Sequence, residues 1–123
     1  MTTQQDVKTR LKTFALRIIR MYVKLPKTDA VAQVLGKQVL RSGTSAGAIF
    51  CEAYRARSPA EFSSKTGESL MELEETAYWL DLIVESGTVP MKKMEDLLSE
   101  TNQLIAILTT INKKTKMVLK HER

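Results

Sequence analysis

Residues 40–65 read LRSGTSAGAIFCEAYRARSPAEFSSK, and this stretch decides the fold because one long helix there carries two apolar seams. With side chains at intervals of about 100°, the seams lie about 120° apart on the helix surface. The first seam consists of Ser42, Ala46, Ile49, Ala53 and Ala56, and the second consists of Leu40, Gly43, Gly47, Phe50 and Tyr54. A helix in a small monomer normally buries one face. We therefore predict that the second seam contacts another copy of the chain in a homo-oligomer.

Helix start and stop signals divide the rest of the chain. Pro26 ends a first helix, and Asp29 is a candidate N-cap for a second. Ser58 and Glu61 have the spacing of a capping box, and Gly87 has the position of a C′ residue. Together with the spacing of apolar residues, these signals predict helices at about 7–25, 30–57, 59–86 and 90–118. We expect one all-α domain over residues 1–123, folded as an antiparallel up-and-down four-helix bundle.

The charge balance favours an anionic partner. The chain carries a net charge of +5 with a pI near 9.4, and it is 27% charged and 43% hydrophobic. Residues 61–88 hold seven acidic residues against one basic residue, whereas the other helices are basic. The folded surface is therefore expected to be polarised.

Compartment and membrane signals are few. No apolar run approaches the roughly 20 residues that span a bilayer, so we predict no membrane association. A lone Cys51 and the absence of a recognisable targeting segment predict a cytoplasmic location.

Catalytic and metal-binding chemistry finds little support in the residue content. His121 is the single histidine and Cys51 the single cysteine, too few for a zinc site. Three acidic residues share a face of the third helix, but no Glu-x-x-His pair completes a carboxylate metal site. Ser42 and Ser45 have no histidine base to activate them. We expect no enzyme activity, no metal and no cofactor.

The first helix carries the main candidate for nucleic-acid binding. Arg10, Arg17, Arg20 and Lys24 form a basic stripe, and residues 7–25 contain no acidic side chain to neutralise it. Phosphate binding by such a stripe tolerates sequence changes and depends strongly on salt. The alternative is an ordinary solvated basic face, because no aromatic residues interleave to stack bases.

The turn between the second and third helices offers two more candidates. Arg57 and Lys65 lie near this turn and have few obvious acidic partners. They are candidate nucleic-acid contacts or, alternatively, solvated charges.

A third stripe of the second helix holds basic and acidic residues together. Arg41, Glu52 and Arg55 recur there at helical spacing, and Glu72 and Glu75 follow on the third helix. Because a carboxylate lies in the same stripe, we interpret these residues as structural ion pairs, of Arg41 and Arg55 with Glu52 or with the other two glutamates. The alternative is an anion-binding surface in which the arginines contact phosphates.

Residues 40–65, followed by EETAYWLDL at 74–82, carry a family resemblance. The pattern R-S-x-x-S-x-G-A is matched by Arg41, Ser42, Ser45, Gly47 and Ala48, and then come Glu52, Arg55, Arg57, Glu61 and Phe62. From about Phe14 to the fourth helix, the chain resembles the bacterial four-helix-bundle family that includes proteins encoded within intervening sequences of large-subunit ribosomal RNA genes. Many members carry asparagine where this chain has Ile49. Any polar contact of that asparagine is absent here.

The resemblance implies a compact bundle that assembles as a homopentamer. A related protein, the accessory variability determinant of diversity-generating retroelements, is a basic pentameric barrel that binds nucleic acid and a reverse transcriptase. Our leading hypothesis is a non-catalytic, homo-oligomeric accessory protein that binds RNA or DNA and has a possible protein partner such as a reverse transcriptase. The alternative is a structural scaffold or protein-interaction module with no nucleic-acid role.

Overall fold

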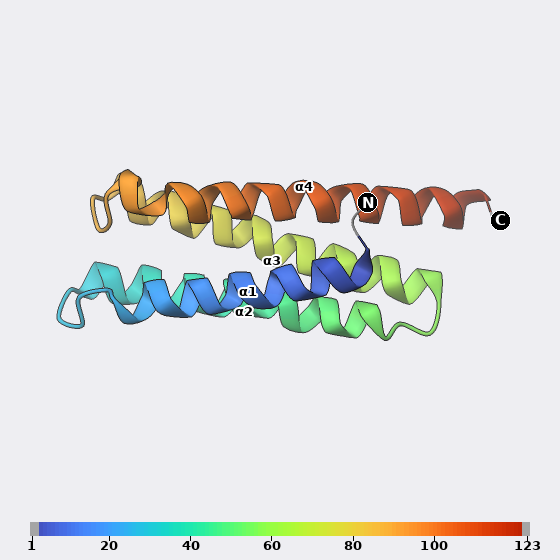
Figure 1. Cartoon of the computed structure of the whole chain (residues 1–123), viewed down its shortest axis with the longest axis horizontal. Coiled ribbons are helices and arrows are strands. Elements are labelled where there is room, and N and C mark those ends of the chain that lie inside the picture. Colours follow the sequence, from blue (N-terminus) through green and yellow to red (C-terminus); the bar gives the residue numbers. More distant parts are fainter. Residues whose placement is uncertain (1–2, 122–123) are drawn as a thin grey trace.

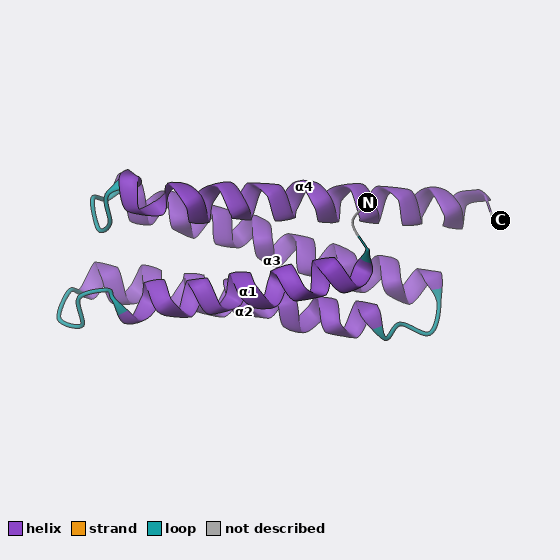
Figure 2. Cartoon of the chain, viewed as in Figure 1, coloured by secondary structure: helices purple, strands orange, loops and turns teal. Residues whose placement is uncertain are grey.

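The computed structural model describes residues 3–121, and within them the chain forms four α-helices and no strand (Figures 1 and 2). The helices are α1 (Gln4–Val23), α2 (Ala30–Tyr54), α3 (Pro59–Glu85) and α4 (Met91–His121). In Figure 1 the α1–α2 and α3–α4 connections lie at one end and the α2–α3 connection at the other. Consecutive helices are therefore antiparallel, which confirms the predicted four-helix bundle.

Polar side chains begin the first three helices. Asp29 accepts a hydrogen bond at 3.0 Å from a backbone N–H in the first turn of α2, as predicted. Ser58 accepts one from the backbone N–H of Glu61 at 3.1 Å, but the Glu61 carboxylate accepts none in return from the backbone N–H of Ser58. The reciprocal capping box forms instead at α1, between Thr3 and Asp6. This cap explains why α1 begins at Gln4 rather than near residue 7.

The end of α3 is a Schellman motif. Gly87 adopts φ +79° and donates to the Val84 carbonyl oxygen at 3.0 Å. Thr88 donates to the Ile83 carbonyl oxygen at 3.1 Å. Because the left-handed conformation costs little only at glycine, Gly87 ends the helix as predicted.

The core lies along the bundle axis. Phe14, Phe50, Leu73 and Leu104 contribute one fully buried side chain from each helix. Each such burial stabilises the fold by roughly 1.5–3 kcal/mol. The helix pairs α1–α2, α2–α3 and α3–α4 pack extensively, whereas α1 contacts α4 over far fewer residues. The bundle is therefore least closed between α1 and α4.

The second apolar seam of α2 packs on α1 of the same chain. A Cβ atom built on Gly43 lies 2.9 Å from Ile18, and one on Gly47 lies 3.5 Å from Leu11. Phe50 is fully buried in the core. The predicted contact of Gly43 and Phe50 with a neighbouring chain is therefore wrong, whereas half-buried Gly47 packs on Leu11 and its contact with a second chain stays a prediction. In a bundle, each helix has two neighbours from its own chain, and two seams on α2 need no third.

The ends of that seam are less buried. Leu40 packs half-buried against the core, and Tyr54 is 41% exposed. The Lys8 ammonium lies 4.7 Å from the centre of the Tyr54 ring, a cation–π contact between α1 and α2. Tyr54 thus also has a partner within its own chain.

Small polar residues of the first seam join α2 to α3. Thr76 Oγ1 lies 2.7 Å from Ser42 Oγ, and Ser69 donates to the Ala46 carbonyl oxygen at 2.7 Å. Thr66 Oγ1 is the one buried side-chain polar atom of residues 3–121 without a hydrogen-bond partner. Serines 42 and 69 therefore act as buried contacts between helices.

Candidate nucleic-acid interface

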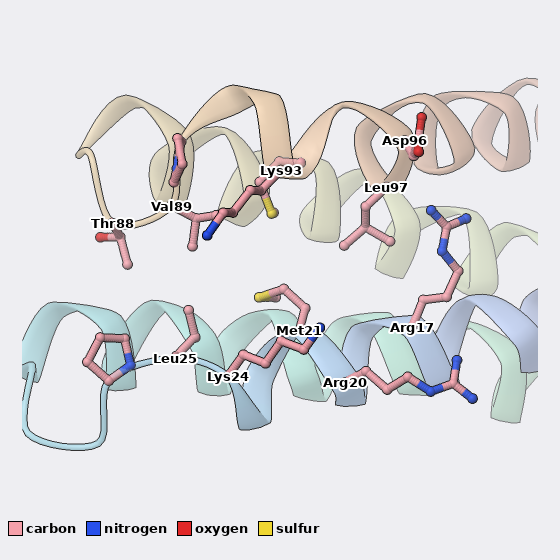
Figure 3. A pocket seen from close by; sticks show the side chains of 13 residues that line it. Arg17, Arg20, Met21, Lys24, Leu25, Thr88, Val89, Lys93, Asp96 and Leu97 are labelled. Carbon is pink, nitrogen blue, oxygen red and sulfur yellow. The ribbon is translucent and has the colours of Figure 1, made fainter.

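A groove of about 690 Å³ opens where α1 and α4 separate, beside the α3–α4 connection (Figure 3). The C-terminal half of α1 forms one wall and the first turns of α4 form the other. The lining residues are Arg17, Arg20, Met21, Lys24, Leu25, Pro26, Thr88, Val89, Pro90, Lys93, Met94, Asp96 and Leu97.

The rim of the groove is cationic. Arg17, Arg20 and Lys24 come from α1 and Lys93 from α4, against the single carboxylate of Asp96. The lining thus carries three net positive charges, and no ion pair within residues 3–121 involves any of these five groups. In Figure 3, Arg17 extends from α1 towards the α4 side, where Asp96 lies. Unpaired cations around a hollow attract anions, because the low-dielectric walls focus their field.

The floor of the groove is apolar. Leu25, Met94 and Leu97 are 5%, 1% and 6% exposed, so they belong to the core and reach the groove with one edge. Met21 and Leu97 point from opposite walls into the space between α1 and α4 (Figure 3). The groove therefore combines a charged rim with an apolar base, which is the usual composition of ligand pockets.

Arg10 does not join this rim. Its guanidinium donates to both carboxylate oxygens of Glu100 on α4, at 3.1 Å and 2.5 Å. The hydrogen bond to Glu100 raises the pKa of Arg10. Its selection as an unpaired nucleic-acid contact is therefore wrong, because the acid that neutralises it comes from α4 and lies 90 residues away in the sequence. The stripe of free cations on α1 shortens to Arg17, Arg20 and Lys24.

Lys65 is also paired. Its ammonium lies 3.3 Å from a Glu52 carboxylate oxygen and 3.5 Å from one of Glu68. The Glu52 carboxylate is the main cause that raises the pKa of Lys65. Lys65 is thus not the unpaired cation that was predicted. Arg57 lies in the α2–α3 turn, at the end of the bundle opposite the groove (Figure 1).

The predicted ion pairs are partly present. Arg41 contacts Glu72 at 3.2 Å and Glu75 at 2.6 Å, which joins α2 to α3 as expected. The hydrogen bond from Arg41, aided by one from the Trp79 indole N–H, lowers the pKa of Glu75. Arg55, by contrast, forms no ion pair within residues 3–121: Glu52 contacts Lys65, and Glu72 and Glu75 contact Arg41.

Lys93 is the residue that sequence reasoning missed. It lies on α4, 69 positions after Lys24, and only the antiparallel return of α4 brings it to the same groove. One signal pointed to it: the first turn of α4 has no acidic residue, although acids are favoured there by the helix dipole.

The part of the chain that the structure describes lacks both a cluster of metal-ligating side chains and a helix suited to a membrane. Among residues 3–121, no group of three or more His, Cys, Asp or Glu side chains is placed to hold a metal ion. No helix in the same range combines the length and the apolar character required to cross a membrane.

The fold and the groove define a small, basic helical-bundle protein with a cationic groove between α1 and α4. Residues 3–110 match the 23S rRNA-intervening sequence protein family, and the chain belongs to that family. It is also similar to a Bacteroides thetaiotaomicron protein of unknown function from the S23 ribosomal protein family, whose crystal structure is known. The two are 34% identical with a TM-score of 0.80, over 89% of this chain and 97% of the other. No curated protein matches the chain.

Proposed function

We propose that this protein is a non-catalytic accessory protein that binds RNA through the groove between α1 and α4. The observation that carries the proposal is a set of four cations around one groove, none of which has an ion-pair partner among residues 3–121: Arg17, Arg20, Lys24 and Lys93. The family name refers to an intervening sequence of 23S rRNA, which favours RNA as the first polyanion to test. The groove lining contains no histidine, cysteine or serine, and the hydroxyl of its Thr88 pairs with that of Ser86 at 2.9 Å rather than with a base.

Salt dependence distinguishes phosphate binding from other contacts. Each phosphate that a lysine or arginine neutralises releases counterions, so affinity falls as salt rises. If all four rim cations contact phosphates, log Kobs against log salt has a slope of roughly −3 per groove. A slope near zero would exclude the rim as the binding surface.

Charge reversal tests the location of binding. We expect Arg17→Glu/Arg20→Glu to lower RNA affinity by at least tenfold in fluorescence anisotropy and to flatten the salt slope. The matched control is Arg55→Glu/Arg57→Glu, which changes the net charge equally at the opposite end of the bundle. Equal losses in the two double variants would refute the groove as the site, because only overall charge would then matter.

We also propose that the chain self-associates through the outer face of α1, with five copies as the family resemblance favours. Leu16, Ile19 and Val23 are 43%, 40% and 62% exposed, and their spacing puts them on one face of α1. Exposed apolar residues grouped in this way are typical of association surfaces. Five grooves in one assembly would repeat the cationic rim and increase binding through multivalency.

Sedimentation velocity tests self-association. We expect the wild type to sediment as an oligomer and Ile19→Glu/Val23→Glu to sediment as a monomer. Met71→Glu/Tyr78→Glu is the control, because those side chains are exposed on α3 and the variant adds the same charge. A wild-type monomer at micromolar concentration would refute the proposal.

A further inference from the structure

We propose that the groove accepts an unpaired nucleotide, so that the RNA it recognises is single-stranded or looped rather than a continuous duplex. This inference rests on the proposed RNA binding and specifies the substrate class for the same site. It is carried by three features that phosphate binding alone leaves unused: the volume of the groove, its apolar floor and the carboxylate of Asp96.

The volume and the floor fit a base. At about 690 Å³, the groove lies within the roughly 300–1,000 Å³ of pockets that enclose small ligands. Met21 and Leu97 face it from opposite walls (Figure 3), and Val89 lines it from the α3–α4 connection. Apolar side chains and a polarisable thioether make favourable contacts with the face of an aromatic ring. An RNA base that is not stacked on its neighbours can cover this apolar floor. The bases of a continuous duplex stay inside the double helix and cannot reach it.

The rim has the length needed to hold the flanking phosphates. Arg17 and Lys24 are seven residues apart, which is about 10 Å along a helix. A stacked strand carries one phosphate about every 3.4 Å, so the rim spans the phosphates on both sides of an inserted nucleotide. The arginine guanidinium groups also offer planar surfaces on which an unstacked base can lie.

Asp96 distinguishes a nucleotide from a phosphate chain. Its carboxylate lies on the α4 side of the groove, across from Arg17 (Figure 3). A carboxylate repels phosphate, so it weakens a surface that binds only the backbone. The exocyclic amino groups of adenine and cytosine and the ribose 2′-hydroxyl are hydrogen-bond donors that a carboxylate accepts. Asp96 therefore favours an inserted base or ribose and disfavours a backbone lying in the groove.

The experiment compares a 12-nucleotide unstructured RNA with a blunt duplex of the same length by fluorescence anisotropy at one salt concentration. We expect the single strand to bind at least tenfold more tightly. Asp96→Ala is the first variant, because the exposed Asp96 side chain contributes nothing to the core. It is expected to weaken single-strand binding by about threefold or more, through the lost acceptor, and to strengthen duplex binding, through the removed negative charge.

The control for Asp96→Ala is Glu95→Ala, which removes the same charge from an exposed neighbour that does not line the groove. We expect Glu95→Ala to strengthen binding of both RNAs by similar small factors. If Asp96→Ala and Glu95→Ala behave alike, the inference is refuted. A loss of folding cannot imitate the expected result, because it would weaken the binding of both RNAs.

Filling the groove is the second test. Val89→Trp occupies the floor without a change of charge, and Val34→Trp, at a site that is 62% exposed on α2, is the matched control. We expect Val89→Trp to lower single-strand affinity by at least tenfold and duplex affinity by less than twofold, with circular dichroism to verify the fold. If the wild type binds the duplex as tightly as the single strand, the inference of an inserted nucleotide is wrong, but the proposed RNA binding stands. Absence of salt-dependent binding to either RNA overturns the proposed function itself.

Discussion

Replacing Gly43 by alanine tests the packing of α2 on α1 of the same chain. A Cβ atom at this position lies 2.9, 3.2 and 3.4 Å from three side-chain carbons of Ile18. Two of those carbons are bonded to the Ile18 Cβ, and a β-branched side chain in a helix has one strongly preferred χ1 rotamer, so the neighbour yields little. Overpacking of this kind costs about 1–3 kcal/mol, while alanine regains about 0.5–1 kcal/mol of helix stability. We expect a net destabilisation of up to about 2.5 kcal/mol.

Gly67→Ala on α3 is the matched control. Its Cβ meets only the Asn112 amide nitrogen, at 3.7 Å, which is an ordinary contact. The helix-propensity gain then remains, and we expect stabilisation by about 0.5–1 kcal/mol. The two substitutions are chemically identical and are expected to differ in sign.

Urea unfolding followed by the fluorescence of Trp79, the single tryptophan, measures both free energies. Because Gly43 contacts its own chain, its effect is expected to be independent of protein concentration. An Ile18→Ala background is expected to reduce the penalty of Gly43→Ala, since the clashing atoms are then absent. If Gly43→Ala stabilises the protein as much as Gly67→Ala does, Gly43 does not pack tightly on Ile18. If the penalty of Gly43→Ala depends on protein concentration, Gly43 lies in an interface between subunits.

Three further predictions concern two buried threonines, the N-terminal cap of α1 and the ion pair between α1 and α4. Thr66→Val is expected to leave stability unchanged or raise it by about 1 kcal/mol, whereas Thr76→Val loses a bond that Thr66 lacks and costs about 1–2 kcal/mol in urea unfolding. Hydrogen bonds from Thr3 lower the pKa of Asp6, so its stabilisation is present above its ordinary pKa of 3.8 and disappears as the pH falls through the lowered value. The Tm difference between wild type and Asp6→Asn is therefore expected at pH 7 and absent in strong acid; a constant difference contradicts this. A double-mutant cycle of Arg10→Ala and Glu100→Ala is expected to show a coupling of about 0.5–1 kcal/mol that shrinks with salt, and zero coupling contradicts the pairing.

Local features were predictable because their partners lie a few residues away. Asp29 and Ser58 cap helices, and Gly87 ends one, through hydrogen bonds within a single turn. The capping box of α1 had the same local character: Thr3 and Asp6 have the required spacing, with aspartate in the place of the usual glutamate. Such features depend only on residues a few positions apart in the sequence. The positions of the helices could therefore be predicted from the sequence alone.

Long-range partners were not predictable in the same way. Helical periodicity indicates which residues share a face, but it does not identify the helix opposite that face. Periodicity therefore predicts a contact between the second apolar seam of α2 and another subunit, whereas Ile18 and Leu11 of α1 pack against the glycines of this seam. Arg10 and Lys65 looked free because their carboxylate partners lie on other helices.

The sequence by itself determined four helices and their antiparallel order, because periodicity and short-range signals at the helix ends specify these locally, and a motif on the second helix carried the family resemblance. Only the tertiary structure decided which cations remain free. The packing of α4 beside α1 neutralises Arg10 with Glu100 and, a few turns away, places Lys93 opposite Arg17 and Lys24. Charge pairing depends on distances between helices, and those distances exist only after the bundle has formed.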